Sequence, residues 1–254
     1  MTIKAMILAA GRGERMRPLT DTCPKPLLRV RGKALIDWHV EALASSGVTD
    51  FIVNTAWLGE QIQTHLYNRF STLISNQIAL QPTQNLRKQL LFSYSHEGAD
   101  FGGALETAGG IARALPLLGD VFWVLAGDVF VPGFGFSQTS VDRFNASGKL
   151  AHLWLVPNPP HNRQGDFGLS DDGLALNLPK SSHAPQFTFS TIALYRKEFF
   201  DALPFGNPHG AKAALAPLLR AAMDNQQVSA ELLDGAWTDV GTPARLAELN
   251  ETST

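Results

Sequence analysis

A glycine-rich loop stands directly behind the first apolar run of the chain, and it constrains the fold more than any other feature. Residues 3–8 are typical of a short, buried parallel strand, and residues 8–27 then read LAAGRGERMRPLTDTCPKPL. Glycines let a backbone close around an anion and offer it bare N–H groups. Arginine and lysine bring the charge opposite to that of phosphate. A strand followed by such a loop predicts a phosphate-binding turn at the edge of an α/β sheet.

Strand and helix patterns alternate behind the loop, which is the order of a parallel α/β sheet. The first half predicts helices over residues 35–45, 58–70 and 105–115, and strands over residues 51–53, 89–94 and 121–125. The second half predicts strands over residues 151–156, 187–195 and 228–233, and helices over residues 211–223 and 243–251. Pro217 should kink the first of these two helices or delay its start. Residues 71–87 are polar and are expected to form an irregular excursion.

Length, charge and cysteine content limit the classes of protein that the chain can belong to. The 254 residues allow one large domain or two small ones. A net charge of −2 argues against a general nucleic-acid binder. No apolar run reaches the roughly 20 residues that span a bilayer, and we expect neither a signal peptide nor a membrane partner. Cys23 is the only cysteine, which excludes an internal disulfide and favours a reducing cytoplasm.

Positive charge is concentrated around the glycine-rich loop. Residues 1–33 contain eight Lys and Arg residues against two acidic ones, a local excess of +6 in a chain whose net charge is −2. Two known phosphate-binding patterns fit poorly. A P-loop needs G-x-x-x-x-G-K-[ST], which is absent, and a dinucleotide fingerprint needs a third glycine where Met16 stands. A dinucleotide-dependent oxidoreductase is therefore disfavoured.

The loop closely resembles the signature of the sugar-nucleotide pyrophosphorylases, which are nucleotidyltransferases that act on sugar 1-phosphates. The resemblance lies in residues 8–20, which read LAAGRGERMRPLT, and in residues 24–27, which read PKPL. It implies a Rossmann-like three-layer α/β/α fold around a central, mostly parallel mixed sheet. It also implies one nucleotidyltransferase domain over residues 1–254, with a nucleotide-binding half over about 1–130 and a sugar-binding half over about 131–254.

The same resemblance assigns roles to residues of the loop. Arg15 is placed to hold the β- and γ-phosphates that leave as pyrophosphate. Lys25 stands between two prolines that restrict its backbone, and it is placed to set a point charge on the phosphates as they exchange. Arg15 and Lys25 are therefore the candidate catalytic residues. The candidate nucleotide contacts of the loop are Leu8, Ala9, Ala10, Gly11, Arg12 and Gly13.

Two aspartates are the candidate metal ligands. Asp128 follows the predicted strand 121–125 in an Ala-Gly-Asp sequence, and Asp239 lies in Trp-Thr-Asp-Val-Gly-Thr-Pro. Taken alone, each is as well explained as a turn or helix-capping aspartate. The resemblance pairs them, because the family's metal-binding carboxylates lie in a G-D after the fourth strand and in a D-x-G-T-P near the end. Two carboxylates and phosphate oxygens suit Mg²⁺, whereas the seven histidines show no metal-binding spacing.

The remaining site residues are implied by the resemblance alone. The family's base-recognition segment is matched by Glu97, Thr107 and Gly109. The candidate sugar-binding residues are Asn54, Asp128, Asn158, Gly165, Asp166 and Ser190. The chain departs from the family pattern in two places. Residues 99–104 look like an insertion, which bears on the register of Glu97, and Thr191 stands where the family usually carries glycine.

The expected chemistry needs no general base. A sugar 1-phosphate has a second pKa of about 6 and is largely dianionic at neutral pH, so it can attack the α-phosphorus of a nucleoside triphosphate directly. Within the family, the chain is most similar to enzymes that join UTP to N-acetylmuramate 1-phosphate in bacterial cell-wall recycling. Guanylyl transfer to mannose 1-phosphate and a catalytically silent sugar-nucleotide sensor remain alternatives. The lactyl carboxylate of N-acetylmuramate should need a cation, for which Lys212 and Arg163 are candidates.

Overall fold

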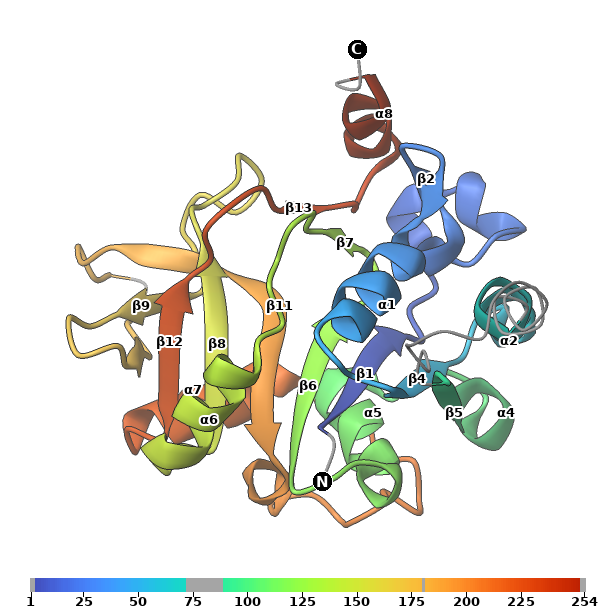
Figure 1. Cartoon of the computed structure of the whole chain (residues 1–254). Coiled ribbons are helices and arrows are strands. Elements are labelled where there is room, and N and C mark those ends of the chain that lie inside the picture. The colour runs from blue at the N-terminus through green and yellow to red at the C-terminus, as the bar shows by residue number, and fades with distance from the viewer. Residues whose placement is uncertain (1–2, 72–88, 180, 252–254) are drawn as a thin grey trace, which may run out of the picture.

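A mixed β-sheet runs through the computed structural model, which describes residues 3–71, 89–179 and 181–251 (Figure 1). Four neighbouring strands are parallel, in the order β6, β1, β4, β5. They are β1 (Lys4–Ala9), β4 (Asp50–Thr55), β5 (Leu91–His96) and β6 (Val121–Ala126). β1, β4 and β6, which each have a strand on both sides in the whole sheet, are almost continuous apolar runs, as expected for strands that are covered on both faces.

The sheet continues beyond β6 with strands of the second half of the chain. β11 (Gln186–Arg196) pairs antiparallel with β6 and with β8 (Ala151–Val156), and β12 (Val228–Leu232) lies parallel to β8. The first residues of β11 pair with β9 (Phe167–Leu169), which pairs in turn with β10 (Ala175–Leu176). A bulge interrupts the pairing of β11 with β8 between Phe189 and Ala193. This bulge lies beside the predicted sugar-binding residues.

Helices cover both faces of the sheet, and each face has its own apolar core. The helices on the first face contribute Ile36, Ile62 and Phe144 to one core, and those on the second face contribute Ile111 and Leu219 to the other. The first face carries α1 (Leu35–Ser45), α2 (Gly59–Leu66) and α6 (Gln138–Ser147), and the second face carries α5 (Glu106–Ala114) and α7 (Leu215–Asp224). Figure 1 shows α1 and α5 on opposite sides of β1. The predicted three-layer α/β/α fold is confirmed.

A smaller apolar cluster, the third core, joins the C-terminal helix to the segments around the glycine-rich loop. Its buried members are Met16, Leu28, Val30, Leu35, Phe130 and Val240. Leu246 and Leu249 of α8 (Pro243–Glu251) pack against it. Asn250 also bonds to the backbone of the hairpin formed by β2 (Arg29–Val30) and β3 (Lys33–Ala34). The residue that breaks the dinucleotide fingerprint, Met16, is therefore a core residue.

Most predicted elements are confirmed, and the differences are local. α1 and β8 have the predicted bounds, and α7 begins at Leu215, so Pro217 lies in its first turn and delays its start. The predicted helix 58–70 is shorter, because α2 ends at Leu66 and a π-helical turn covers Tyr67–Ser71. From residue 72 on, the predicted excursion falls outside the described residues. None of the described helices has the length and apolar character that a bilayer crossing requires.

Candidate active site

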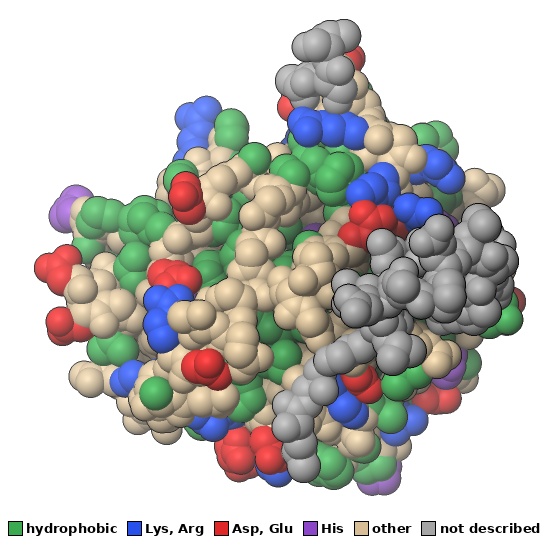
Figure 2. Space-filling model, in the orientation of Figure 1, with side chains coloured by type: hydrophobic (Ala, Val, Ile, Leu, Met, Phe, Trp, Pro, Cys, Tyr) green, Lys and Arg blue, Asp and Glu red, His purple; other side chains and the backbone are tan. Residues whose placement is uncertain are grey.

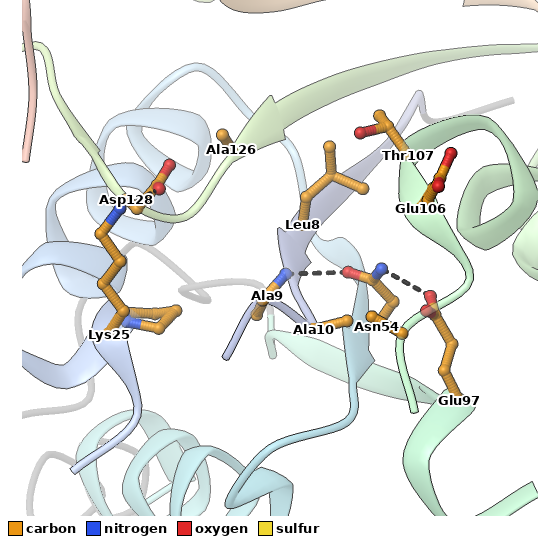
Figure 3. A pocket seen from close by; sticks show the side chains of 13 residues that line it. Leu8, Ala9, Ala10, Lys25, Asn54, Glu97, Glu106, Thr107, Ala126 and Asp128 are labelled. Atoms are coloured by element: carbon orange, nitrogen blue, oxygen red, sulfur yellow. Dashed lines mark hydrogen bonds and ion pairs between the residues drawn. The ribbon is translucent and has the colours of Figure 1, made fainter. Parts of the chain in front are cut away.

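A pocket opens where β1 and β6 end, which is the edge at which parallel α/β sheets bind ligands. It encloses about 250 Å³. In Figure 3, Lys25 and Asp128 lie on one side of the end of β1, and Glu97, Glu106 and Thr107 lie on the other. The lining residues are Leu8, Ala9, Ala10, Gly11, Lys25, Pro26, Asn54, Glu97, Ala104, Glu106, Thr107, Ala126 and Asp128. The pocket thus gathers catalytic and nucleotide-binding candidates from distant parts of the sequence.

The turn after β1 depends on a glycine in the left-handed region. Gly13 has φ of 70°, and a Cβ on it would lie 3.0 Å from Cγ2 of Thr20. The buried Thr20 hydroxyl in turn donates a 2.8 Å hydrogen bond to the carbonyl of Gly13. A side chain at this position would both strain the backbone and displace Thr20. Gly13 is therefore required for the shape of the loop.

The arginines of the loop differ in what they contact. Arg12 donates to the carbonyl of Thr20 at 2.8 Å and lies over the ring of Trp57, 3.7 Å from its centroid. Arg17 is exposed and pairs with Asp21 at 2.8 Å. Arg15 is also exposed and makes no ion pair with any residue that the structure describes. It is the loop arginine that keeps its guanidinium available for phosphate. Figure 2 shows basic side chains gathered near α8 and β2, in the region of this segment.

Lys25 and Asp128 form an ion pair at the floor of the pocket (Figure 3). Lys25 lies in a short 3₁₀ turn behind Pro24 and is only 8% exposed, so its ammonium is largely shielded from water. Gly127 lets the backbone before Asp128 lie close to the end of β1, because a Cβ on Gly127 would lie 3.0 Å from the carbonyl of Leu8. The predicted catalytic lysine and the first predicted metal ligand are thus direct neighbours.

A short strand pair brings the second aspartate to the first. β7 (Val129–Phe130) pairs antiparallel with β13 (Thr238–Asp239), and Asp239 lies opposite Val129. The N–H of Val240 donates to the carbonyl of Asp128 at 2.9 Å. Two carboxylates at one edge are the hard oxygen donors that suit Mg²⁺ together with substrate phosphates. Among the described residues, no group of three or more His, Cys, Asp or Glu side chains is placed to hold a metal ion, so the metal-binding role of Asp128 and Asp239 stays a prediction.

The Asp239 carboxylate has two partners that the sequence did not indicate. Arg245 donates from Nη1 to Oδ1 and to the carbonyl of Asp239, the latter at 3.1 Å. His161 Nε2 lies 2.9 Å from the same Oδ1. Arg245 belongs to the first turns of α8, and His161 belongs to the loop behind β8. His161 is distant in sequence from Asp239, so no local pattern predicts its contact, whereas Arg245 follows Asp239 by six residues.

Asn54 and Glu97 connect the end of β1 to the start of α5. The N–H of Ala9 donates to Oδ1 of Asn54 at 2.8 Å, and Nδ2 of Asn54 donates to Glu97 at 2.6 Å (Figure 3). The other Glu97 oxygen accepts from the N–H of Leu105 at 2.7 Å. Burial raises the pKa of Glu97, and the bonds from Leu105 and Asn54 oppose that shift. Asn54 therefore lies on the nucleotide side of the site, with both ends of its amide engaged, and its sugar contact stays a prediction.

Residues 99–104, the apparent insertion, fold into a short helix and a turn. They do not move Glu97 out of the pocket wall. Residues Glu97–Phe101 form the short helix α4, which ends at Gly102 with φ of 75°. Asp100 of this helix pairs with Arg113 of α5 at 2.9 Å. The turn returns the chain so that Leu105 bonds to Glu97. Glu97 thus keeps its place in the pocket wall, where its role in nucleotide binding stays a prediction.

The two glycines of α5, Gly109 and Gly110, make room for different neighbours of the helix. Thr107 lines the pocket as predicted for a nucleotide contact, but Gly109 is buried and does not. A Cβ on Gly109 would lie 2.6 Å from the carbonyl of Ala211, so this glycine allows another chain segment to approach the helix. A Cβ on Gly110 would lie 2.5 Å from a Glu97 oxygen. Gly110, which the sequence analysis did not select, is thus the glycine that leaves room for Glu97.

Four of the six predicted sugar-binding residues gather around the first half of β11, and the other two, Asn54 and Asp128, line the pocket. Nδ2 of Asn158 donates to the carbonyl of Gln186 at 2.8 Å, and Asp166 accepts from the N–H of Phe189 at 2.8 Å. Gly165 has φ of 69°. Ser190 is fully buried. These four predicted residues lie together but outside the wall of the pocket described above. Their polar groups hold the loop behind β8 against β11, and their contact with a sugar stays a prediction.

Thr191 has an unusual conformation within the bulge of β11. Its φ is 71°, in the left-handed region that β-branched residues rarely occupy. Its hydroxyl oxygen is buried and has no hydrogen-bond partner among the described residues. The neighbouring carbonyl of Ser190 accepts a 3.0 Å hydrogen bond from Nε1 of Trp237, two residues before Asp239. Glycine, which the family usually carries at position 191, would adopt this backbone conformation without strain.

Comparison with known proteins shows the family and the fold of the chain. The sequence profile of the nucleotidyl transferase family matches residues 4–254. An N-acetylmuramate alpha-1-phosphate uridylyltransferase of Neisseria meningitidis is 45% identical over 97% of this chain and 96% of its own length. A protein of the same name from Caulobacter vibrioides is 30% identical over 96% of this chain and 97% of its own length. The crystal structure of a UDP-glucose pyrophosphorylase with UDP-glucose shares the fold, with a TM-score of 0.73 at 18% identity, over 99% of this chain and 98% of the other. The chain belongs to the nucleotidyl transferase family.

Proposed function

We propose that the chain transfers a uridylyl group from UTP to N-acetylmuramate 1-phosphate, giving UDP-N-acetylmuramate and pyrophosphate. The observation that carries the proposal is the β7–β13 pairing, because it sets Asp239 beside Asp128, which itself pairs with Lys25. The choice of substrates rests on the Neisseria meningitidis and Caulobacter vibrioides relatives, which match almost the whole chain and carry this activity in their names.

In the proposed reaction, each of these residues has its own role. The turn around Gly13 receives the triphosphate, and the exposed Arg15 holds the phosphates that leave as pyrophosphate. The shielded ammonium of Lys25 stabilises charge that spreads over the transferred phosphate. The dianionic sugar phosphate attacks in line, so the chain has to position it rather than deprotonate it. Asp128 and Asp239 would hold Mg²⁺, which, when bound, supplies further neutralisation of the phosphate charge.

The proposal extends to the setting of the enzyme. A nucleotide-binding half over about 1–130 holds the phosphate loop, Lys25 and Asp128, and a sugar-binding half over about 131–254 supplies the loops around β11. UDP-N-acetylmuramate is a cell-wall precursor, so we assign the enzyme to peptidoglycan recycling in the cytoplasm. UTP and a sugar 1-phosphate are the proposed partners.

A pyrophosphate-release matrix tests the proposal. UTP, GTP, ATP and dTTP are each combined with N-acetylmuramate, mannose, glucose and N-acetylglucosamine 1-phosphates, with Mg²⁺ and with EDTA. We expect release above background with UTP and N-acetylmuramate 1-phosphate, and its loss with EDTA. Preferred use of GTP and mannose 1-phosphate would replace the substrates that we propose. No release in any well would favour the silent sensor. Asp239→Asn serves as the site variant and Asp142→Asn, an exposed aspartate of α6, as the matched control.

A further inference from the structure

Arg245 and His161 meet at the Asp239 carboxylate, and the proposed mechanism gives neither of these two side chains a role. Arg245 and His161 both approach Oδ1 of Asp239, and Arg245 Nη1 also lies 3.1 Å from His161 Nε2. The three side chains, here called the Asp239 cluster, are partly shielded, with exposures of 17% for Arg245, 37% for His161 and 23% for Asp239. A guanidinium and an imidazole thus share one carboxylate oxygen.

The arrangement leaves donors to spare. His161 Nε2 can donate to Asp239 or accept from Arg245, but a single nitrogen serves one of them at a time. Both contacts are made to Oδ1, so Oδ2 of Asp239 can ligate a metal while Arg245 and His161 stay in place, and Nη2 of Arg245 has no hydrogen-bond partner among the described residues. Arg245 stays aimed at the same place when Asp239 ligates a metal, because Nη1 also bonds to the backbone carbonyl of Asp239 and Nε lies 3.4 Å from Thr242 Oγ1. The cluster is therefore prepared to receive another anion.

Among the other cations of the sugar-binding half, Arg220 and Arg163 donate hydrogen bonds to other groups. Arg220 donates to Asn177 at 2.7 Å and to the backbone carbonyl of Asp166. Arg163, a candidate from the sequence, is exposed and donates to the carbonyl of Pro160. Lys212, the other candidate, is exposed on the segment whose backbone packs against the first turn of α5. Of these arginines, Arg245 is the one whose guanidinium reaches a predicted metal ligand.

We propose that Arg245 and His161 bind the lactyl carboxylate of N-acetylmuramate 1-phosphate and so select this sugar over N-acetylglucosamine 1-phosphate, which lacks the lactyl ether. The inference rests on the proposed function. A carboxylate that leaves water needs charged hydrogen-bond donors, and the planar guanidinium of arginine matches a carboxylate with two parallel N–H groups. The phosphate is common to all sugar 1-phosphates, so the selectivity has to come from contacts with the lactyl ether, whose charged group is the carboxylate.

Calorimetric titration with two nucleotide sugars tests the proposal. Wild type, Arg245→Gln, Arg245→Lys and His161→Gln are titrated with UDP-N-acetylmuramate and with UDP-N-acetylglucosamine. Arg143→Gln, which removes an exposed arginine paired with Glu231, is the control. We expect Arg245→Gln to weaken binding of UDP-N-acetylmuramate about 10- to 100-fold, the value of hydrogen bonds to a charged group. Binding of UDP-N-acetylglucosamine should change by less than about 3-fold, and Arg245→Lys should fall between wild type and Arg245→Gln.

The outcomes separate this inference from the proposed function. Equal losses for both nucleotide sugars would overturn it, since Arg245 would then serve a shared phosphate or Asp239 itself. Unchanged binding of UDP-N-acetylmuramate would overturn it as well. Arg245→Lys keeps the charge and guards against a folding defect in Arg245→Gln, which melting temperatures also report. If wild type releases no pyrophosphate from UTP and N-acetylmuramate 1-phosphate but does so with another pair, the proposed function has failed instead.

Discussion

Replacing Thr191 by glycine should stabilise the protein, although it removes buried atoms. Thr191 holds φ of 71° inside the bulge of β11, a conformation that costs about 1–2 kcal/mol for a residue with a Cβ. Its buried hydroxyl oxygen has no partner, which costs about 1–3 kcal/mol more. Against this, glycine loses about 0.5–1 kcal/mol through the greater freedom of the unfolded chain. The loss of two side-chain carbons, Cβ and Cγ2, removes about 1.6 kcal/mol of burial.

The balance favours Thr191→Gly by about 1 kcal/mol, which corresponds to a rise of roughly 2–4 °C in the melting temperature of a chain of this size. Urea unfolding followed by tryptophan fluorescence measures the free energy of unfolding, and an unchanged dependence on urea shows that the unfolded state is comparable. Thr191→Ala separates the two terms, because alanine removes the hydroxyl and keeps the backbone strain. If Thr191→Gly lowers the free energy of unfolding, the reasoning from strain and burial is refuted.

Three further predictions concern the site and its surroundings. Lys25→Ala should lower the rate of pyrophosphate release about 100- to 1000-fold, as loss of one positioned charge does. Lys33→Ala, which removes a lysine paired with Glu41, is the control. A loss of only a few fold would make Lys25 a positioning residue. Gly110→Ala forces a Cβ to within 2.5 Å of a Glu97 oxygen and should destabilise by about 1–3 kcal/mol in urea unfolding; unchanged stability would contradict the tight packing. Burial lowers the pKa of His39 to about 4. The unfolded chain therefore binds a proton first as pH falls, and stability should drop by roughly 3 kcal/mol between pH 6.5 and pH 4. His39→Gln should remove this part of the dependence in unfolding curves measured across that range.

The elements that could be predicted from the sequence are those with a strong local pattern. α1 repeats apolar residues at helical spacing, and β8 is a continuous apolar run, so both have their predicted bounds. α6 was missed because it buries only Val141 and Phe144 and is otherwise polar. Its start does carry a local signal, since the hydroxyl of Ser137 caps the N–H of Ser140 at 3.1 Å.

The parts of the site that escaped prediction depend on contacts between distant segments. β7 and β13 have two residues each, too few for any periodicity, although their pairing is what aligns Asp128 with Asp239. The glycine-rich loop could be recognised because its chemistry is contained in one stretch. His161, in contrast, lies on a loop that only the folded chain brings to Asp239, and Arg245, although six residues away, carries no pattern that marks it as a partner.

The third core gives the site a stability of its own. It contains Met16 from the phosphate loop, Leu28 from the segment after Lys25, Phe130 beside Asp128 and Val240 beside Asp239. Further cover comes from Cys23, from Trp38 and from α8, none of whose residues is fully buried. A small cluster of this kind can open while the main sheet stays folded, so its amide protons should exchange with solvent sooner than those of β1 or β6. A nucleotide that touches all of these segments would hold the cluster closed. The affinity for the nucleotide therefore depends partly on how often the third core opens. Substitutions in α8 should weaken nucleotide binding before they lower the melting temperature.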